Sequence, residues 1–442
     1  MPDKPSIRLW AAVALAGCWL IAVGAGHAHE PGRDPGRASG GTVTQRAPAG
    51  APVASNAAEL RSMLEAADGP AEIWLGPGTH TGQFTIRRSL ALHGETGAIL
   101  DGAGYGTVLT IEAASVLVDN LVIRHSGRRN TAEDAGIRAK GSGIRIRNVR
   151  VQDALFGITL GPCPRCVVER CHVHGDGPQA ELKGDGIKLW ESNDAVVRDS
   201  LVEGVRDVVV WYSRRVLLEG NTVRNSRYGS HFMYAHDSIV RHSRIVDNVV
   251  GIFVMYSSRL HVENNVLAGA RGAAGVGLGF KESDGVQVSG NWFVANTTGT
   301  YLDETPSSPL QPVHFVDNLF ALNDVALRLH GVGNGLSFTQ NEFRDNALLA
   351  DVEGGSDAMS VEFMHNQYSD YAGYDLNADG TGDVAYQLKR LSGAMLDAHP
   401  TLAFFEGTAA SGLLDVIARA APVFSSRLLL VDPQPSMRRR PL

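Results

Sequence analysis

Three residues with soft or borderline donor atoms lie near the middle of this 442-residue chain. His231 and Met233 are two positions apart, so in a β-strand both side chains project to the same face. Met255 occupies the position equivalent to Met233 in the next sequence repeat. Two thioethers and an imidazole form a donor set that suits Cu(I) in transit. These residues therefore predict a copper site, and the alternative is a methionine-rich surface for packing or for docking a partner.

A second cluster combines three cysteines with two histidines within twelve residues. Cys163 and Cys166 form a C-x-x-C pair, and Cys171, His172 and His174 follow. Such a group of residues has metal-ligand character. In an oxidising compartment, however, cysteines at this spacing more often pair with each other. Two interpretations stay open: a metal cluster, or a disulfide with one spare thiol.

A third set of polar side chains alternates along a Gly-rich stretch near the C-terminus. The oxygen-bearing residues are Asp375, Asn377, Asp379, Thr381 and Asp383. Ligands at positions 1, 3, 5 and 9, with Gly380 at the sharp turn, resemble a calcium loop. Tyr386 replaces the bidentate Glu expected at the twelfth position. The sequence predicts either an incomplete calcium site or an Asx-rich turn without an ion.

A repeat of short apolar segments must position these side chains. Similar strings recur every 21 to 27 residues, and each carries a polar residue at the equivalent position: Ser200, Asn221, Ser243, Asn265, Asn291, Asn318, Asn341 and Asn366. A period of this length, built from β-rich runs, is typical of a solenoid whose coils stack to bury a common core. We therefore predict an all-β fold, a right-handed parallel β-helix. Asn tolerates the left-handed backbone of a tight turn, and its amide can bond the Asn of the next coil.

Alternation along the strands predicts which side chains face the core. One parity gives apolar or small columns: Ile187, Val208, Ser230 and Ile252, with Leu189, Val210, Phe232 and Val254. The opposite parity contains Lys188 and His231, which are poor core residues, so we place it outward. It would present an apolar ridge formed by Trp190, Trp211, Met233 and Met255, unless the ridge packs under a loop or points inward. A large exposed apolar surface usually marks an interface or a ligand site. We expect an interface at Trp190, Trp211, Tyr234 and Tyr256.

Composition excludes some functions and permits a long core. The chain is 44% hydrophobic and 20% charged, as in ordinary globular proteins. Its net charge is −7, with an isoelectric point near 6.1. No broad basic surface attracts nucleic acid, so we expect no nucleic-acid partner.

The two ends of the chain differ from the repeats. Residues 1–28 have the pattern of a signal peptide, with a basic start, an apolar run and a small-residue cleavage site near Ala28. Lipid attachment at Cys18 is the alternative. We predict a disordered leader over residues 29–55. The β-helix domain follows over residues 56–368, with a capping helix near residues 57–67 that starts from Ser55 or Asn56. A C-terminal extension covers residues 369–442 and contains a helical segment near residues 412–421.

Several strings of the chain are more specific than the repeat itself. They are Gly184-Asp-Gly-Ile-Lys-Leu-Trp, Arg206-Asp-Val-Val-Val-Trp-Tyr-Ser, Arg227-Tyr-Gly-Ser-His-Phe-Met-Tyr, Gly251-Ile-Phe-Val-Met-Tyr-Ser, Gly373-Tyr-Asp-Leu-Asn-Ala-Asp-Gly-Thr-Gly-Asp, and Val423-Phe with Leu430-Val-Asp-Pro-Gln-Pro-Ser-Met. With these strings the chain resembles the NosD family of periplasmic β-helix proteins. The resemblance runs from about residue 55 to the C-terminus.

The resemblance implies an accessory protein for maturation of copper-containing nitrous oxide reductase. Its partners would be the membrane component of an ABC transporter and a periplasmic copper enzyme or copper chaperone. Copper would be the transient cofactor, and sulfur is a further species that such proteins are thought to supply. Less regular Asn turns in the first three coils, and the cysteine cluster, depart from the family and leave open a different client enzyme.

The rival interpretation is a carbohydrate-active β-helix enzyme, a lyase, hydrolase or epimerase on an acidic polysaccharide. Asp185, Asp207, Arg227, Tyr228 and His231 could line one groove for such chemistry. The Asn-Thr-Asp, Asp-Asp and Gly-His-Gly strings of polygalacturonases and the Asp-Pro-His-Asp string of alginate epimerases do not occur. We therefore expect a non-catalytic protein.

Overall fold

The computed structural model describes residues 45–175, 183–353, 356, 358–390 and 427–438. The signal peptide expected at residues 1–28 and the helix expected near residues 412–421 lie outside these residues. Among the helices that are described, none has the length and apolar character needed to cross a membrane.

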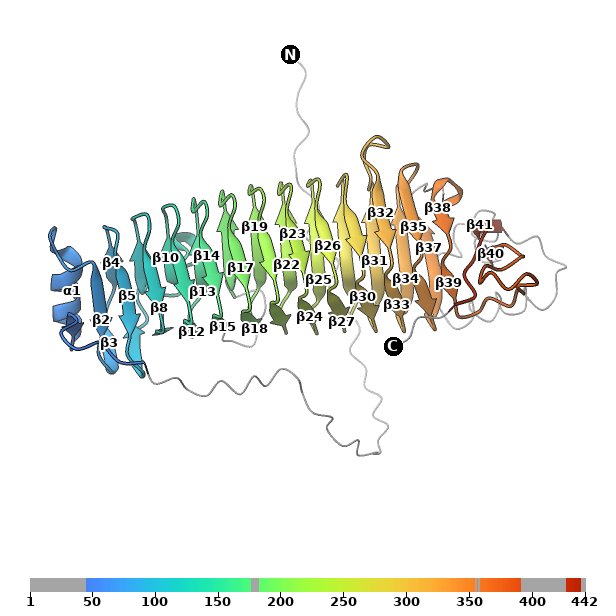
Figure 1. The fold of residues 1–442 in the computed structure, drawn as a ribbon. Coiled ribbons are helices and arrows are strands. Elements are labelled where there is room, and N and C mark those ends of the chain that lie inside the picture. The colour runs from blue at the N-terminus through green and yellow to red at the C-terminus, as the bar shows by residue number, and fades with distance from the viewer. Residues whose placement is uncertain (1–44, 176–182, 354–355, 357, 391–426, 439–442) are drawn as a thin grey trace, which may run out of the picture. The chain divides into compact units, whose positions relative to one another are not determined.

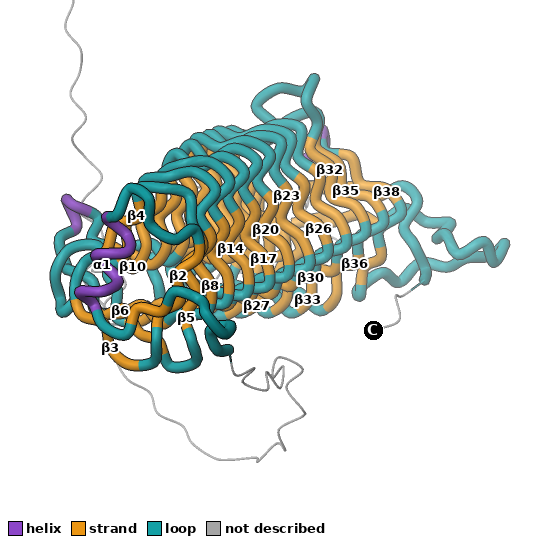
Figure 2. The backbone as a smooth tube through the Cα atoms, turned by 60° about the vertical axis from the view of Figure 1, so that its left-hand side comes forward, coloured by secondary structure: helices purple, strands orange, loops and turns teal. Residues whose placement is uncertain are grey.

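Three parallel sheets run along the stack of coils in the described residues (Figures 1 and 2). One has fourteen strands, from β1 (Val53–Ala54) to β38 (Glu362–Met364), and another has thirteen, from β3 (Gly78–Thr81) to β39 (Gln367–Tyr368). The chain contributes one strand to each sheet per coil, so every strand pairs with its equivalents in the adjacent coils. The predicted right-handed parallel β-helix is confirmed.

The third sheet has twelve strands and carries the predicted copper ligands His231, Met233 and Met255 together with Trp190 and Trp211. Its strands are β4 (Phe84–Ile86), β7 (Leu109–Ile111), β10 (Ala135–Ala139), β13 (Phe156–Leu160), β16 (Ile187–Trp190), β19 (Asp207–Trp211), β22 (Tyr228–Met233), β25 (Val250–Met255), β28 (Val276–Lys281), β31 (Thr298–Asp303), β34 (Val325–His330) and β37 (Leu348–Glu353).

The predicted inward columns do form the core. Leu189, Val210, Phe232 and Val254 are fully buried and pair in register from β16 to β25. Burial of such a continuous apolar column is what stabilises coils that could not fold singly. Toward the C-terminal end the core becomes aromatic, and the rings of Phe315 and Phe338 stack with centroids 4.6 Å apart.

Buried asparagines join successive coils, as the sequence predicts. Asn291 donates from Nδ2 to the side chain of Asn318 (3.0 Å), and the same acceptor oxygen receives the backbone amide of Asn291 (2.9 Å). The expected left-handed backbone lies one residue earlier, at positions such as Asn264 and Gly290. The buried Asn itself follows that turn, because its side chain must point inward to reach its neighbour. Our assignment of the turn conformation to these asparagines was therefore wrong by one residue.

Both ends of the stack are closed within the described residues. Helix α1 (Ala57–Glu65) begins at Asn56, whose side chain accepts hydrogen bonds from the amides of Ala58 and Glu59, and it buries Leu60 and Leu64. Before it, Val53–Ala54 forms strand β1 on β2 (Glu72–Leu75), so the leader expected over residues 29–55 ends earlier than predicted.

At the other end, two strands of the C-terminal extension form an antiparallel pair, β40 (Tyr386–Arg390) with β41 (Arg427–Asp432). The Asp432 carboxylate terminates the Asn ladder, because its Oδ2 atom accepts hydrogen bonds from the amide and the side chain of Asn366. Tyr368 also donates its hydroxyl to Asp432.

Candidate metal-binding site

Adjacent strands bring the predicted copper ligands together. His231 and Met233 project outward from β22, and Met233 pairs in register with Met255 on β25. The Nε2 atom of His231 lies 3.4 Å from the Sδ atom of Met255. Two ligands bound to one ion at roughly 2.0–2.3 Å and a tetrahedral angle lie about 3.5 Å apart, so the observed separation fits a shared ion.

Aromatic rings and a carboxylate surround His231 and restrict its orientation. The ring of Trp211 meets it edge-on at 5.7 Å between centroids, and the ring of Tyr228 lies at 4.9 Å. Nδ1 of His231 is buried, has no hydrogen-bond partner among the described residues, and lies 3.8 Å from Oδ2 of Asp207. A carboxylate on this side favours the proton on Nδ1 and leaves the Nε2 lone pair facing the sulfur.

The candidate groove of the rival enzyme is also assembled, but as ion pairs between coils. Arg227 donates hydrogen bonds to both oxygens of the buried Asp207 carboxylate. One coil earlier, Arg206 contacts only Oδ1 of Asp185, and Oδ2 is buried with no hydrogen-bond partner among the described residues. Burial raises the pKa of Asp207, but its contacts with His231 and Arg227 outweigh this effect and leave it below the ordinary value. For Asp185, burial dominates and raises the pKa.

The predicted ridge is only partly exposed. Trp190 is 41% exposed, whereas Trp211, Met233 and Met255 are half-buried. Trp211 packs against its neighbours, and the ammonium group of Lys188 lies 5.8 Å from the centre of a Trp211 ring. The ridge therefore points outward as predicted but is less open than the sequence suggests.

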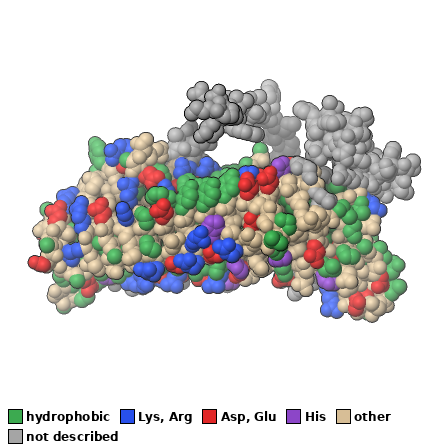
Figure 3. Space-filling view, turned by 90° about the horizontal axis from the view of Figure 1, so that it is seen from above, with side chains coloured by type: hydrophobic (Ala, Val, Ile, Leu, Met, Phe, Trp, Pro, Cys, Tyr) green, Lys and Arg blue, Asp and Glu red, His purple; other side chains and the backbone are tan. Residues whose placement is uncertain are grey.

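A ladder of tyrosines lies immediately beyond the ridge. Tyr212, Tyr234 and Tyr256 stack with centroids 5.2 Å apart from coil to coil. All three have positive φ, which turns the chain just after the strand and places the rings side by side at the surface. Tyr212 and Tyr234 are exposed, and Figure 3 shows hydrophobic side chains gathered on the face seen from above. We did not predict Tyr212 as an interface residue, although its position repeats that of Tyr234 and Tyr256.

The cysteine and histidine cluster does not form one metal site. Cys163 and Cys166 form a disulfide, and Cys171 is a buried free thiol whose pKa is raised to about 12 by burial. Alternation on β15 (His172–His174) explains the separation: Cys171 points into the core while His172 and His174 point outward. The five-residue metal cluster is thus corrected to a disulfide, a buried thiol and two outward histidines.

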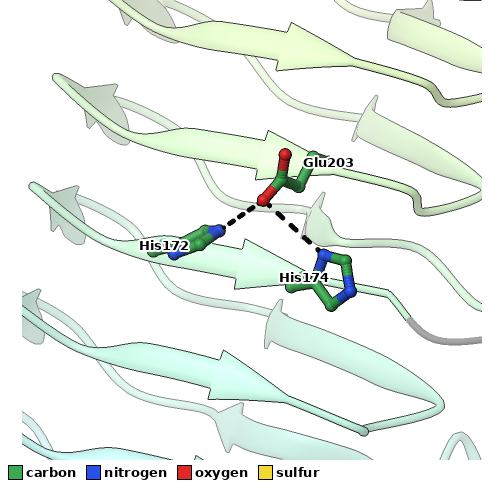
Figure 4. Close-up of side chains that lie close together, drawn as sticks. All are labelled: His172, His174 and Glu203. Atoms are coloured by element: carbon green, nitrogen blue, oxygen red, sulfur yellow. Dashed lines mark hydrogen bonds and ion pairs between the residues drawn. The ribbon is translucent and has the colours of Figure 1, made fainter. Parts of the chain in front are cut away.

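Those two histidines meet a carboxylate that the sequence did not suggest. Oε1 of Glu203 lies 2.8 Å from Nε2 of His172 and 3.6 Å from Nδ1 of His174 (Figure 4). Among the His, Cys, Asp and Glu side chains of the described residues, only these place three ligand atoms within 4.8 Å of one another.

The predicted calcium loop is a turn held by its own backbone. Asp375 accepts hydrogen bonds from the amides of Asp379 and Gly380, and Asp379 accepts one from the amide of Thr381. Asp383 accepts a hydrogen bond from the amide of Leu376. These carboxylates already satisfy loop amides, which is what an Asx-rich turn requires, so calcium at Asp375, Asn377, Asp379, Thr381 and Asp383 stays a prediction.

Residues 170–373 match the sequence model of the family described as periplasmic copper-binding protein (NosD). The match covers both β22 and β25. The resemblance to the NosD family is confirmed. A probable ABC transporter binding protein NosD from Pseudomonas aeruginosa is 29% identical over 409 residues, covering 81% of this chain and 87% of that protein. The NosD protein of the same description from Stutzerimonas stutzeri is 27% identical over 408 residues, covering 81% and 85%.

Solved structures outside the NosD proteins share the fold. The A-module of the Azotobacter vinelandii mannuronan C-5 epimerase AlgE6 has a TM-score of 0.56 at 12% identity, covering 73% of this chain and 97% of that chain. The tailspike gp61 of Pseudomonas phage phi297 has a TM-score of 0.50 at 12% identity, covering 76% and 78%. At these identities the likeness concerns the β-helix alone.

Proposed function

We propose that this protein is an exported, non-catalytic accessory protein that holds copper as cargo during assembly of a periplasmic copper enzyme. The contact between His231 Nε2 and Met255 Sδ carries the proposal, because an imidazole and a thioether then face one point on the outside of the coils. Thioether sulfur donates well to Cu(I) and poorly to harder ions. The NosD match, with its description as a periplasmic copper-binding protein, supports the same cargo.

The surroundings of His231 suit transfer better than permanent storage. His231 itself is 9% exposed, while Met233 and Met255 remain half-open to solvent. An ion held there would be shielded on one side by Trp211 and Tyr228 and reachable from the other. The exposed tyrosine ladder (Tyr212, Tyr234 and Tyr256) adjoins this opening and supplies aromatic area of the kind that interfaces favour. We assign it to docking of the ABC transporter component that the names of the relatives indicate.

The carbohydrate-active enzyme has one observation in its favour, the buried carboxyl of Asp185 with its raised pKa. A protonated carboxyl could act as a general acid. Arg206 holds that carboxyl, however, and Arg227 holds Asp207, so neither group is presented to a substrate. These ion pairs connect successive coils, so their role is to stabilise the stack of coils.

Maturation in cells tests the proposal. A strain lacking this protein should produce its periplasmic copper enzyme, with nitrous oxide reductase the first candidate, in a copper-deficient form. Wild-type protein should restore the copper content, and His231→Gln should not, although it accumulates to the same level. Full copper loading in the deletion strain would contradict the role. Release of unsaturated or reducing ends from alginate or pectate, lost in Asp185→Asn, would instead favour the enzyme.

A further inference from the structure

A second group of metal-binding side chains lies on a different sheet from His231 and Met255. His172 and His174 project outward from β15, and Glu203 ends the neighbouring strand β18 (Leu201–Glu203). His174 and Glu203 pair in register, so the three side chains share one face of two adjacent strands. Figure 4 shows both imidazole rings directed toward the Glu203 carboxylate.

The next coil holds that carboxylate in place. Arg224, on β21 (Thr222–Arg224), pairs in register with Glu203 and donates from Nε to Oε2 at 2.8 Å. Oε1 is therefore left facing His172 and His174. The Glu203 side chain is only 15% exposed. Arg224 thus orients the carboxylate, as a second hydrogen-bond partner commonly does around metal ligands.

All three ligand atoms lie within 4.8 Å of one another, and two of their separations can be compared with those around a bound ion. Ligand atoms of a tetrahedral site with bonds of about 2.0–2.2 Å lie about 3.3–3.5 Å apart. The two histidine-to-glutamate separations, 2.8 and 3.6 Å, lie on either side of that value. Both histidine side chains are partly exposed, so an ion can enter and a fourth ligand can be water or a partner group.

We propose that His172, His174 and Glu203 form a second metal site, which takes a divalent first-row transition ion of the Zn²⁺ type. Imidazole nitrogen and carboxylate oxygen suit such ions, whereas Cu(I) prefers the thioethers of the other site. The site does not depend on the proposed copper function, because it shares no residue with that site. Arg224 offsets the negative charge of Glu203, which should weaken the binding of a cation.

Equilibrium dialysis of the untagged full-length protein against Zn²⁺, followed by metal analysis, tests the proposal. Wild-type protein should retain one equivalent that is lost in His172→Gln/His174→Gln, with apparent affinity at least tenfold weaker in Glu203→Gln. His261→Gln is the matched control, because His261 also contacts a glutamate, Glu263, at 3.2 Å but has no third His, Cys, Asp or Glu ligand nearby in the described part of the chain. Circular dichroism of each variant verifies that it is folded.

Two further measurements separate this site from the copper site. Saturating Zn²⁺ should raise the unfolding temperature of the wild-type protein and of Met255→Leu, but not that of His172→Gln/His174→Gln. Cu(I) binding should survive in the double variant. The second site would be overturned if the wild-type protein retained no Zn²⁺, or if it retained the same amount as the folded variants. Either result would leave the copper proposal untouched.

Discussion

The Nε2 atom of His231 lies 3.4 Å from the Sδ atom of Met255, although 24 residues separate them in the chain. The parallel register of β22 and β25 creates this contact. His231 pairs with Phe253, and Met255 lies two residues after Phe253 on the same strand, so its long side chain extends back along β25 to reach the imidazole. Met233 is instead the register partner of Met255 and lies farther along the strand. In the proposed copper site, His231 and Met255 would therefore be the primary ligand pair, with Met233 as a third donor.

The Asn ladder should contribute strongly to stability. Asn291 donates to the carbonyl of Val262 and accepts the backbone amide of Asn265. Asn291→Ala removes the acceptor of the buried Asn265 amide and one of the donors to the Val262 carbonyl, so we expect the free energy of unfolding to fall by about 2–4 kcal/mol. Chemical denaturation measures the loss. Asn334→Ala, in an exposed turn, is the control and should change stability by less than about 0.5 kcal/mol. Equal effects of the two substitutions would mean that the ladder adds little.

Thiol reactivity should follow the assigned disulfide. In a Cys18→Ser background, denatured protein without reductant should react with one equivalent of a thiol reagent, at Cys171. Native protein should react slowly, because Cys171 is 2% exposed and burial raises its thiol pKa to about 12. Reduction before denaturation should raise the count to three. Three reactive thiols without reduction would show that Cys163 and Cys166 are not paired.

Stability should decline in acid through Asp119. Burial alone raises the pKa of this carboxyl, but hydrogen bonds from His93, Arg147 and Asn148 hold it well below the ordinary value. A pKa lowered by folding stabilises the protein above the unfolded value, near 3.9, and that contribution is lost as the pH falls below it. Asp119→Asn should therefore cost about 1–3 kcal/mol at pH 7. The difference from the wild-type protein should shrink below about pH 4, whereas a pH-independent difference would exclude Asp119 as the cause.

The tyrosine ladder should act in docking and not in copper binding. Tyr212→Ala/Tyr234→Ala removes the two most exposed rings of the ladder, so co-purification with the transporter component should fall at least tenfold while Cu(I) affinity stays within twofold. Tyr105→Ala, at a tyrosine that is 74% exposed in the early coils, serves as the control and should leave co-purification unchanged. Normal co-purification of the double variant would remove the ladder from the interface.

Much of the fold could be predicted because the same pattern of polar and apolar residues recurs in many coils. One coil is ambiguous, but equivalent positions from Ser200 to Asn366 fix the period, and alternation on β22 places Phe232 inward and His231 outward. The same alternation, applied at Cys171 and His172, would have separated the cysteine from the histidines beforehand. Glu203 was not predictable in this way. Its register partner is His174, 29 residues earlier, whereas the repeats from Ser200 to Asn366 are 21 to 27 residues long.

A competition assay for Cu(I) tests the central claim most directly. With ascorbate to keep copper reduced and bicinchoninate as the competing ligand, wild-type protein should bind one equivalent in the coil region. Met255→Leu keeps the volume nearly constant but removes the sulfur, so affinity should fall at least tenfold, as it should in His231→Gln. Met437→Leu, at an exposed methionine of the C-terminal extension, should bind like the wild-type protein. Unchanged affinity in both Met255→Leu and His231→Gln would contradict a copper site at this contact.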